Sequence, residues 1–225
     1  KIISIMMLMI ISLSVYANDI YINQSGATLD LDVTQDGQNN TVGSSSTASS
    51  VIGATTNLAI TQIGDSNVMT FDVNGANYTG TFSVTGNSNN IDFNCDSGGS
   101  NSSCGTATAS IVWVGSSNDI DIDIGETSSA TSATVGITGA SGSDSNTILG
   151  TIDGNSAILT LSVNGDTNNF LVDIDGNGDS VGHTYIHTHT GSIADVDITQ
   201  SGVYDNMITL TTSGDNADID IIQRD

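Results

Sequence analysis

The chain has no proline and almost no positive charge. Its 225 residues include two lysines or arginines against 25 acidic residues, which gives a formal net charge of −23. Because proline removes a donor from a strand ladder, its absence suits a backbone that is paired almost throughout. Nucleic acid is excluded as a partner, since almost no side chain could neutralise its phosphates.

Aromatic residues and cysteines are also scarce. Aromatics make up 4% of the chain, with Trp113 as the only tryptophan, and there are two cysteines and three histidines. No pairing of a nucleophile with a base can be picked out. Secreted β-helices that cleave glycosides usually combine aspartates with aromatic platforms, for which this chain has few residues. We therefore expect no enzymatic function.

Glycine recurs at intervals of eleven residues, each time after a stretch in which apolar and polar residues alternate. The series are Gly26–Gly37, Gly64–Gly75–Gly86 and Gly154–Gly165–Gly176. Two such strand-turn units make a rung of about 22 residues, which is within the range of solenoid repeats. Helix-type spacing is missing. The period predicts an all-β protein, a β-solenoid whose rungs bury their apolar edges only as a stack.

The N-terminal residues read as a secretory signal. Lys1 precedes an apolar run from Ile2 to Val15, and small residues flank Tyr16 where a signal peptidase cuts. The run is shorter than the roughly 20 residues that a membrane helix needs. We expect residues 1–17 to be removed, leaving residues 18–225 as one exported domain with no membrane span, secreted or attached to the cell surface.

Aspartates alternate with aliphatic residues in several stretches, such as the run from Ile120 to Ile124. The isoleucines should point into the coil and the aspartates out of it. Unit charges about 4.8 Å apart on stacked rungs repel by about 0.9 kcal/mol even in bulk water. Salt, low pH or a divalent cation would relieve this repulsion. The alternative is an ordinary solvated face that keeps the protein soluble.

Three segments rich in serine, glycine, threonine and alanine interrupt the period, and we expect them to leave the coil as loops. They are residues 43–56, 96–109 and 126–145. Cys95 and Cys104 bracket the second segment, and in an exported protein this pair most simply closes a local disulfide.

The turns contain a short polar motif. Ile60–Asn67 and Val33–Asn40 resemble the curlin repeat, in which Gln-x-Gly-x-(Gly/Asn)-Asn follows an alternating strand, and Ile198–Gly202 and Ile22–Gly26 match its first half. The glycine and asparagine suit left-handed turns; glutamine and asparagine can also stack as amide ladders. Both interpretations stay open. The motif residues are Gln24, Gly26, Gln35, Gly37, Asn40, Gln62, Gly64, Asn67, Gln200 and Gly202.

Curlin subunits are secreted bacterial proteins that polymerise into curli, the surface amyloid fibres used for adhesion and in the biofilm matrix. The resemblance implies the same role here, with the protein itself as partner through edge-to-edge stacking. Curli-type secretion or nucleation proteins would be further partners. The chain departs from the curlin pattern at Leu29, Thr56 and Ala194, where curlin repeats carry serine. Its glutamine ladder should be incomplete, and a polar targeting segment is missing after the signal.

Two groups of residues suggest metal ligands. His187 and His189 share one strand face, which is either an exposed metal site or a polar surface. An acidic run resembles the first half of a calcium loop without its distal glutamate; the alternative is a turn that continues the period. No cofactor is required, and calcium is the candidate ion. Its ligands would be Asp173, Asp175, Asn177 and Asp179.

Two functions follow from these patterns. The first is a structural subunit that extends fibres through open edges near Ile20 to Asn23 and near Ile219 to Gln223. The alternative is a monomeric, calcium-stabilised β-roll that serves as an adhesin or binding module. Calcium-dependent folding without polymerisation would favour the second.

Overall fold

The computed structural model describes most of the chain as β-strand. The described residues are 19–37, 39–43, 48–64, 66–86, 88–96, 104–115, 118–125, 132–140, 142, 145–154, 156–175, 183–192, 194–202 and 206–224. None of them forms a helix that is long and apolar enough to cross a membrane. The predicted signal, residues 1–17, lies outside these ranges.

The strands follow one another at short intervals. They are β1 (Asp19–Ile20), β2 (Asn23–Asp36), β3 (Thr41–Val42), β4 (Ser49–Ile63), β5 (Val68–Thr85), β6 (Asn90–Cys95), β7 (Cys104–Val114), β8 (Asp119–Ile124), β9 (Ser132–Gly139), β10 (Thr147–Asp153), β11 (Ala157–Asn164), β12 (Asn168–Asp175), β13 (Thr184–Thr190), β14 (Ala194–Ser201), β15 (Met207–Ser213) and β16 (Asp218–Arg224).

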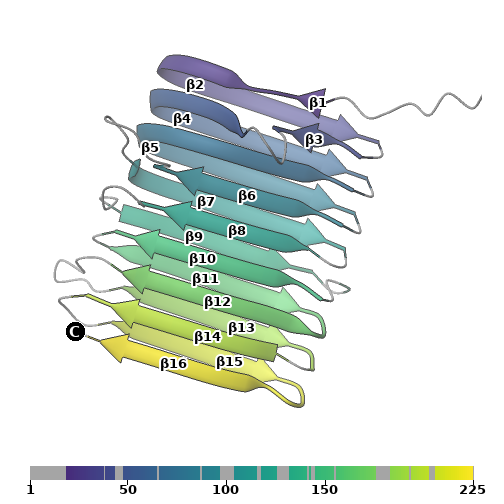
Figure 1. Ribbon diagram of the computed structural model, residues 1–225, viewed down its shortest axis with the longest axis vertical. Coiled ribbons are helices and arrows are strands. Elements are labelled where there is room, and N and C mark those ends of the chain that lie inside the picture. Colours follow the sequence, from purple (N-terminus) through teal and green to yellow (C-terminus); the bar gives the residue numbers. More distant parts are fainter. Residues whose placement is uncertain are drawn as a thin grey trace, which may run out of the picture.

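Parallel pairing winds these strands into the predicted β-solenoid, stacked along one axis from β2 to β16 (Figure 1). The coil has two faces. The odd face consists of β7, β9, β11, β13 and β15, continued by the C-terminal parts of β2, β4 and β5. The even face consists of β6, β8, β10, β12, β14 and β16, continued by β1, β3 and the N-terminal parts of β2, β4 and β5.

The number of residues between paired positions on successive rungs equals the predicted 22 in the shortest rungs and is larger in the others. Val68 pairs with Asn90, 22 residues on, whereas Gly75 pairs with Cys104, 29 residues on, and the mean is about 26. Low-complexity segments lie in the longest rungs, such as that from Gly75 to Cys104, whereas Ile158 and Thr184 are paired 26 residues apart without such a segment between them.

The expectation that the low-complexity segments leave the coil as loops is wrong in part, because β4 begins at Ser49, β7 at Cys104 and β9 at Ser132. Within these strands, Ser50, Thr108 and Thr134 are paired with neighbouring strands on both sides.

Alternating side chains fill the space between the two faces. Ile120, Ile122 and Ile124 are buried, and the intervening Asp121 and Asp123 lie on the outer surface, as predicted. The large residues of the core, among them Trp113 and four phenylalanines, also point inward. Full burial of each such apolar side chain contributes about 1.5–3 kcal/mol, so the interior holds the two faces together.

One corner of the coil brings backbones into close contact at glycines. Gly37 and Gly64 donate their N–H groups to the carbonyls of Ile63 and Thr85, both at 2.9 Å. Gly64 has φ 152°, and a Cβ added there would overlap the carbonyl oxygen of Gly37. Gly86 meets the carbonyl of Gly64 in the same way. Glycine is therefore needed at this corner for both its space and its backbone conformation.

We expect Gly64→Ala to lower the free energy of unfolding by at least ~2 kcal/mol, because both the contact and the positive φ oppose a Cβ. The matched control is Gly136→Ala on the outer side of β9, where an added Cβ meets nothing within 4 Å. This control should be neutral or stabilising. Denaturant titration followed by Trp113 fluorescence measures both, and equal effects would contradict the close-contact explanation.

Candidate assembly surfaces

Asparagines at the same corner tie each turn together. The side-chain amides of Asn40, Asn118 and Asn168 donate to the carbonyl of the glycine three residues earlier, at 2.8, 2.9 and 2.7 Å. Asn67 does the same to Gly64 at 3.3 Å. These asparagines are buried. Each thus provides a hydrogen-bond donor to a carbonyl of its own turn.

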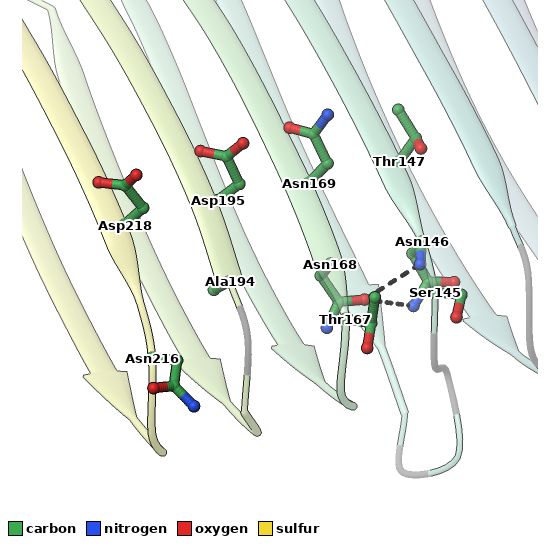
Figure 2. A pocket seen from close by; sticks show the side chains of 10 residues that line it. All are labelled: Ser145, Asn146, Thr147, Thr167, Asn168, Asn169, Ala194, Asp195, Asn216 and Asp218. Atoms are coloured by element: carbon green, nitrogen blue, oxygen red, sulfur yellow. Dashed lines mark hydrogen bonds between the residues drawn. The ribbon is translucent and has the colours of Figure 1, made fainter.

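Some of these asparagines also stack along the axis. Asn118 Nδ2 donates to Asn146 Oδ1 at 3.0 Å, and Asn146 Nδ2 donates to Asn168 Oδ1 at 2.8 Å. Figure 2 shows Asn168 beside Asn146, with the outward row of Thr147, Asn169, Asp195 and Asp218 next to them. Ala194 follows Asn168 in register and ends the ladder. A groove of about 540 Å³ lies at this point.

The N-terminal glutamines form a shorter ladder. Gln62 Nε2 donates to Gln35 Oε1 at 2.7 Å, and Gln35 Nε2 donates across the turn to the carbonyl of Thr41 at 3.3 Å. Val84 is next in register after Gln62. The ladder stops there and leaves Gln62 Oε1 buried without a hydrogen-bond partner among the described residues. Apolar residues continue the row.

A second glutamine pair lies at the opposite end of the stack. Gln223 Nε2 donates to Gln200 Oε1 at 3.3 Å. Following the strand register along the even face, the row that contains Gln200 runs back through apolar residues to Gln24. Polar amides therefore occupy this row near both ends of the described stack. Gly26 and Gly202 lie at corners, where Gly202 has φ 158°.

The recurring spacing Gly-x-x-Asn could have revealed the asparagine ladder in the sequence. Asn118, Asn146 and Asn168 belong to no curlin-like match, because glutamine is absent from their turns. Gly115 and Gly165 nonetheless precede Asn118 and Asn168 by three residues, as Gly37 precedes Asn40.

The outer surface of the even face is strongly acidic. Asp92 pairs with Asp121, and Asp119 and Asp123 flank them on the same surface. The pKa of Asp92 is raised, first by partial burial and then by the charges of Asp123, Asp72 and Asp119. The repulsion predicted for stacked aspartates is therefore present on this face.

The structure places only part of the predicted calcium loop. Asp173 and Asp175 point outward from β12, and the pKa of Asp173 is raised by burial and then by Asp175. Asp175 Oδ1 accepts a hydrogen bond from Ser201 at 2.8 Å. Asn177 and Asp179 lie outside the described residues. Within the described ranges, no three His, Cys, Asp or Glu side chains are grouped so that they could hold a metal.

A disulfide joins Cys95 at the end of β6 to Cys104 at the start of β7. Both residues are buried, and they connect the even face to the odd face across the second low-complexity segment. The crosslink removes freedom from the unfolded chain and fixes where the longer rung re-enters the stack.

The interpretation of the histidines as an exposed strand face is wrong. His187 and His189 share a face with Tyr185, and all three point into the core. The outward residues of β13 are threonines and Ile186. Tyr185 Oη and His187 Nδ1 lie 3.0 Å apart, and Phe170 packs edge-on against His187. When both sets of alternating residues in a strand are largely polar, the sequence does not reveal which set points into the core. Pairing with the neighbouring strands decides the orientation.

The two ends of the described stack leave inward-facing apolar side chains incompletely covered. Ile219 and Ile221 continue the inward rows of Val196 and Ile198, yet they are 38% and 46% exposed. Among the described residues, β16 pairs only with β14. At the other end, Ile20 and Ile22 are only partly buried against the core. The predicted edges are therefore apolar where a further rung would lie.

No family model, curated protein or solved structure matches the chain.

The buried histidines make stability depend on pH. Burial and, to a smaller extent, repulsion from His189 lower the pKa of His187 to about 3. The unfolded histidine titrates near its usual pKa of about 6.5, so it takes up the proton first as the pH falls. The stability that the neutral ring contributes is present above pH ~6.5 and is lost between that pH and about 3, by roughly 1.4 kcal/mol per pH unit.

We expect His187→Leu to flatten this dependence by about that slope, since Leu161 and Leu210 already flank the position in its row. The measurement is the free energy of unfolding of both proteins from pH 7 to 4 at constant ionic strength. Comparing the two proteins cancels the titration of the acidic face. Parallel profiles would mean that His187 does not titrate on unfolding.

Proposed function

We propose that this protein is a secreted structural subunit that assembles end to end into curli-like extracellular fibres, which serve adhesion and the biofilm matrix. The observation that supports this most directly is the similarity of the two edge strands. Asp19-Ile20-Tyr21-Ile22-Asn23-Gln24 and Asp218-Ile219-Asp220-Ile221-Ile222-Gln223 share the pattern Asp-Ile-x-Ile-x-Gln. Both lie on the even face, at opposite ends of the stack.

Register makes these edges complementary. Ile20 and Ile219 lie at the two ends of one inward row, and Gln24 and Gln223 lie at the ends of another. A second copy placed on β16 in parallel register would bring isoleucine onto isoleucine. It would also bring Gln24 onto Gln223, continuing the amide contact between Gln223 and Gln200.

The same joint continues the odd face. Ile208 and Leu210 of β15 are partly buried, as are Leu31 and Val33 of β2. Ile208 and Leu31 lie at the two ends of one inward row, and Leu210 and Val33 lie at the two ends of another. Joining copies in this way therefore buries apolar surface on both faces at once and satisfies unpaired backbone groups of two strand edges. Because each copy joins the next head to tail along the stack axis, the assembly does not close into a ring and grows into a fibre.

Acidic rows oppose this joining. Aspartates already repel one another on the even face, and each added copy lengthens the rows. We expect salt or calcium to accelerate assembly by screening, even where no dedicated calcium site forms.

Electron microscopy and thioflavin fluorescence of residues 18–225, diluted from denaturant, test the proposal. Parallel samples at equal ionic strength contain calcium or a chelator. Unbranched fibres support it. Compact monomers in every condition would overturn it, and calcium-dependent folding without fibres would establish the β-roll alternative.

A pair of variants on β16 tests the joint itself. Ile221→Lys places an ammonium where a second copy should bury an isoleucine, and we expect fibre elongation to slow by about tenfold or more. Ile222→Lys is the control, because Ile222 is equally exposed at 43% but points outward in the row of Thr199. Both monomers should fold, since these edge positions are already solvated. Equal rates for the two variants would show that β16 is not the growing edge.

A further inference from the structure

The outer surface of the odd face differs in chemistry from that of the even face. From β4 to β15 its outward positions carry no charged side chain, and most are threonine or serine. The strands β5, β7 and β9 bring Thr79, Thr108 and Thr134 into one row along the axis. The strands β9 to β15 bring Thr138, Ser162, Thr188 and Thr211 into another.

Between these two rows runs the row of Thr81, Ser110, Gly136 and Thr160. Together these rows form a two-dimensional array, or lattice, of mostly hydroxyl and methyl groups, in which Val112, Ile158 and Ile186 also lie. Neighbours along the axis are about 4.8 Å apart, and alternate residues along one strand are about 6.7 Å apart. Threonine is β-branched and holds few χ1 rotamers, so the hydroxyls are ordered before any ligand arrives. The strands also keep nearly the same direction from one end of the stack to the other (Figure 1), as in sheets of low twist that side-chain ladders stabilise.

Charge is absent from this lattice between β4 and β15, whereas Asp30, Asp32 and Asp36 of β2 lie at its N-terminal edge. The acidic residues of β6, β8, β12, β14 and β16 point outward from the opposite face. A charged group in the lattice would hold its own hydration shell and break any regular arrangement of water above the threonines. The two faces therefore suit different surroundings. The even face suits liquid, ionic solvent, and the odd face suits contact with an uncharged, ordered surface.

We propose that the odd face binds ice. Both repeats lie close to oxygen repeats on a prism face of hexagonal ice, so one lattice of water can hydrogen-bond to successive hydroxyls while the methyl groups fill the spaces between them. The bound ligand is ordered water itself. Each added rung lengthens the matching surface, so a single protein presents many weak contacts at fixed positions, and their effects add.

Other flat ligands fit less well. A crystalline polysaccharide calls for aromatic platforms, whereas the large rings of β5, β7 and β13, namely Tyr78, Trp113 and Tyr185, lie inside the core. A second copy bound face to face is the remaining occupant, and the test below separates it.

The test compares two lysine substitutions on adjacent strands of opposite faces, in the Ile221→Lys background, in which we expect fibre elongation to be slow. Thr160→Lys places a charge on the odd face at β11, and Thr151→Lys places one on the even face at β10; both positions are exposed. Ice affinity partitioning and the thermal hysteresis of single ice crystals are the measurements. The parent should partition into ice and shape the crystals. Thr160→Lys should lose about tenfold or more of the hysteresis, and Thr151→Lys should keep it.

A gain of function provides the complementary measurement. Gly136 lies between Ser110 and Thr160 in one row, with open space around a new Cβ. Gly136→Thr fills this gap, and we expect it to raise the hysteresis. A parent that is excluded from ice overturns the proposal, as does equal loss in the two lysine variants. If the protein is retained on insoluble cellulose or chitin and not on ice, the ligand of the odd face is a polysaccharide. If sedimentation shows a dimer that Thr160→Lys disrupts, the ligand is a second copy of the protein. None of these outcomes depends on whether fibres form.

Discussion

Close backbone contact at the glycine corner is the constraint on which the rest of the structure depends. Successive rungs approach there until a carbonyl oxygen occupies the space that a side chain would need, as the pair Gly37 and Gly64 shows. That approach keeps the rungs parallel and in register. In-register rungs then force like side chains into rows, and the rows give each surface its character. The apolar core, the amide ladders, the acidic face and the threonine lattice are all consequences of this one geometry.

Stacking like on like is favourable for some side chains and unfavourable for others. Isoleucine rows bury apolar surface, and asparagine rows satisfy one another's amides, as Asn118, Asn146 and Asn168 do. Aspartate rows repel, and at Asp92 this repulsion adds to the effect of partial burial in raising the pKa. The balance between these effects sets how readily a further rung is added. In the proposed fibre, ions in the medium would shift that balance without contacting the joint.

The two faces would give a fibre two functional sides. The proposed growth proceeds along the axis at the edge strands, and it leaves both broad faces free. An assembled stack would repeat the acidic surface of the even face and the hydroxyl surface of the odd face along the fibre, with the outward aspartates of β2 recurring once per copy on the odd face. Assembly would therefore strengthen whatever the faces bind, because contacts that one molecule makes weakly are repeated at fixed spacing along the fibre.

The sequence by itself determined the periodic features. The eleven-residue glycine period and the alternation of isoleucine with aspartate predict the solenoid and the inside of most strands, because both depend only on neighbours along the chain. Sequence did not reveal the strands inside the serine-rich segments, where Ser49 and Ser132 become strand residues because adjacent rungs supply partners. It also left the orientation of His187 open, since in Tyr-Ile-His-Thr-His either set of alternating residues could be inside. Only the tertiary structure decided these points, because register between rungs places residues more than twenty positions apart in one row.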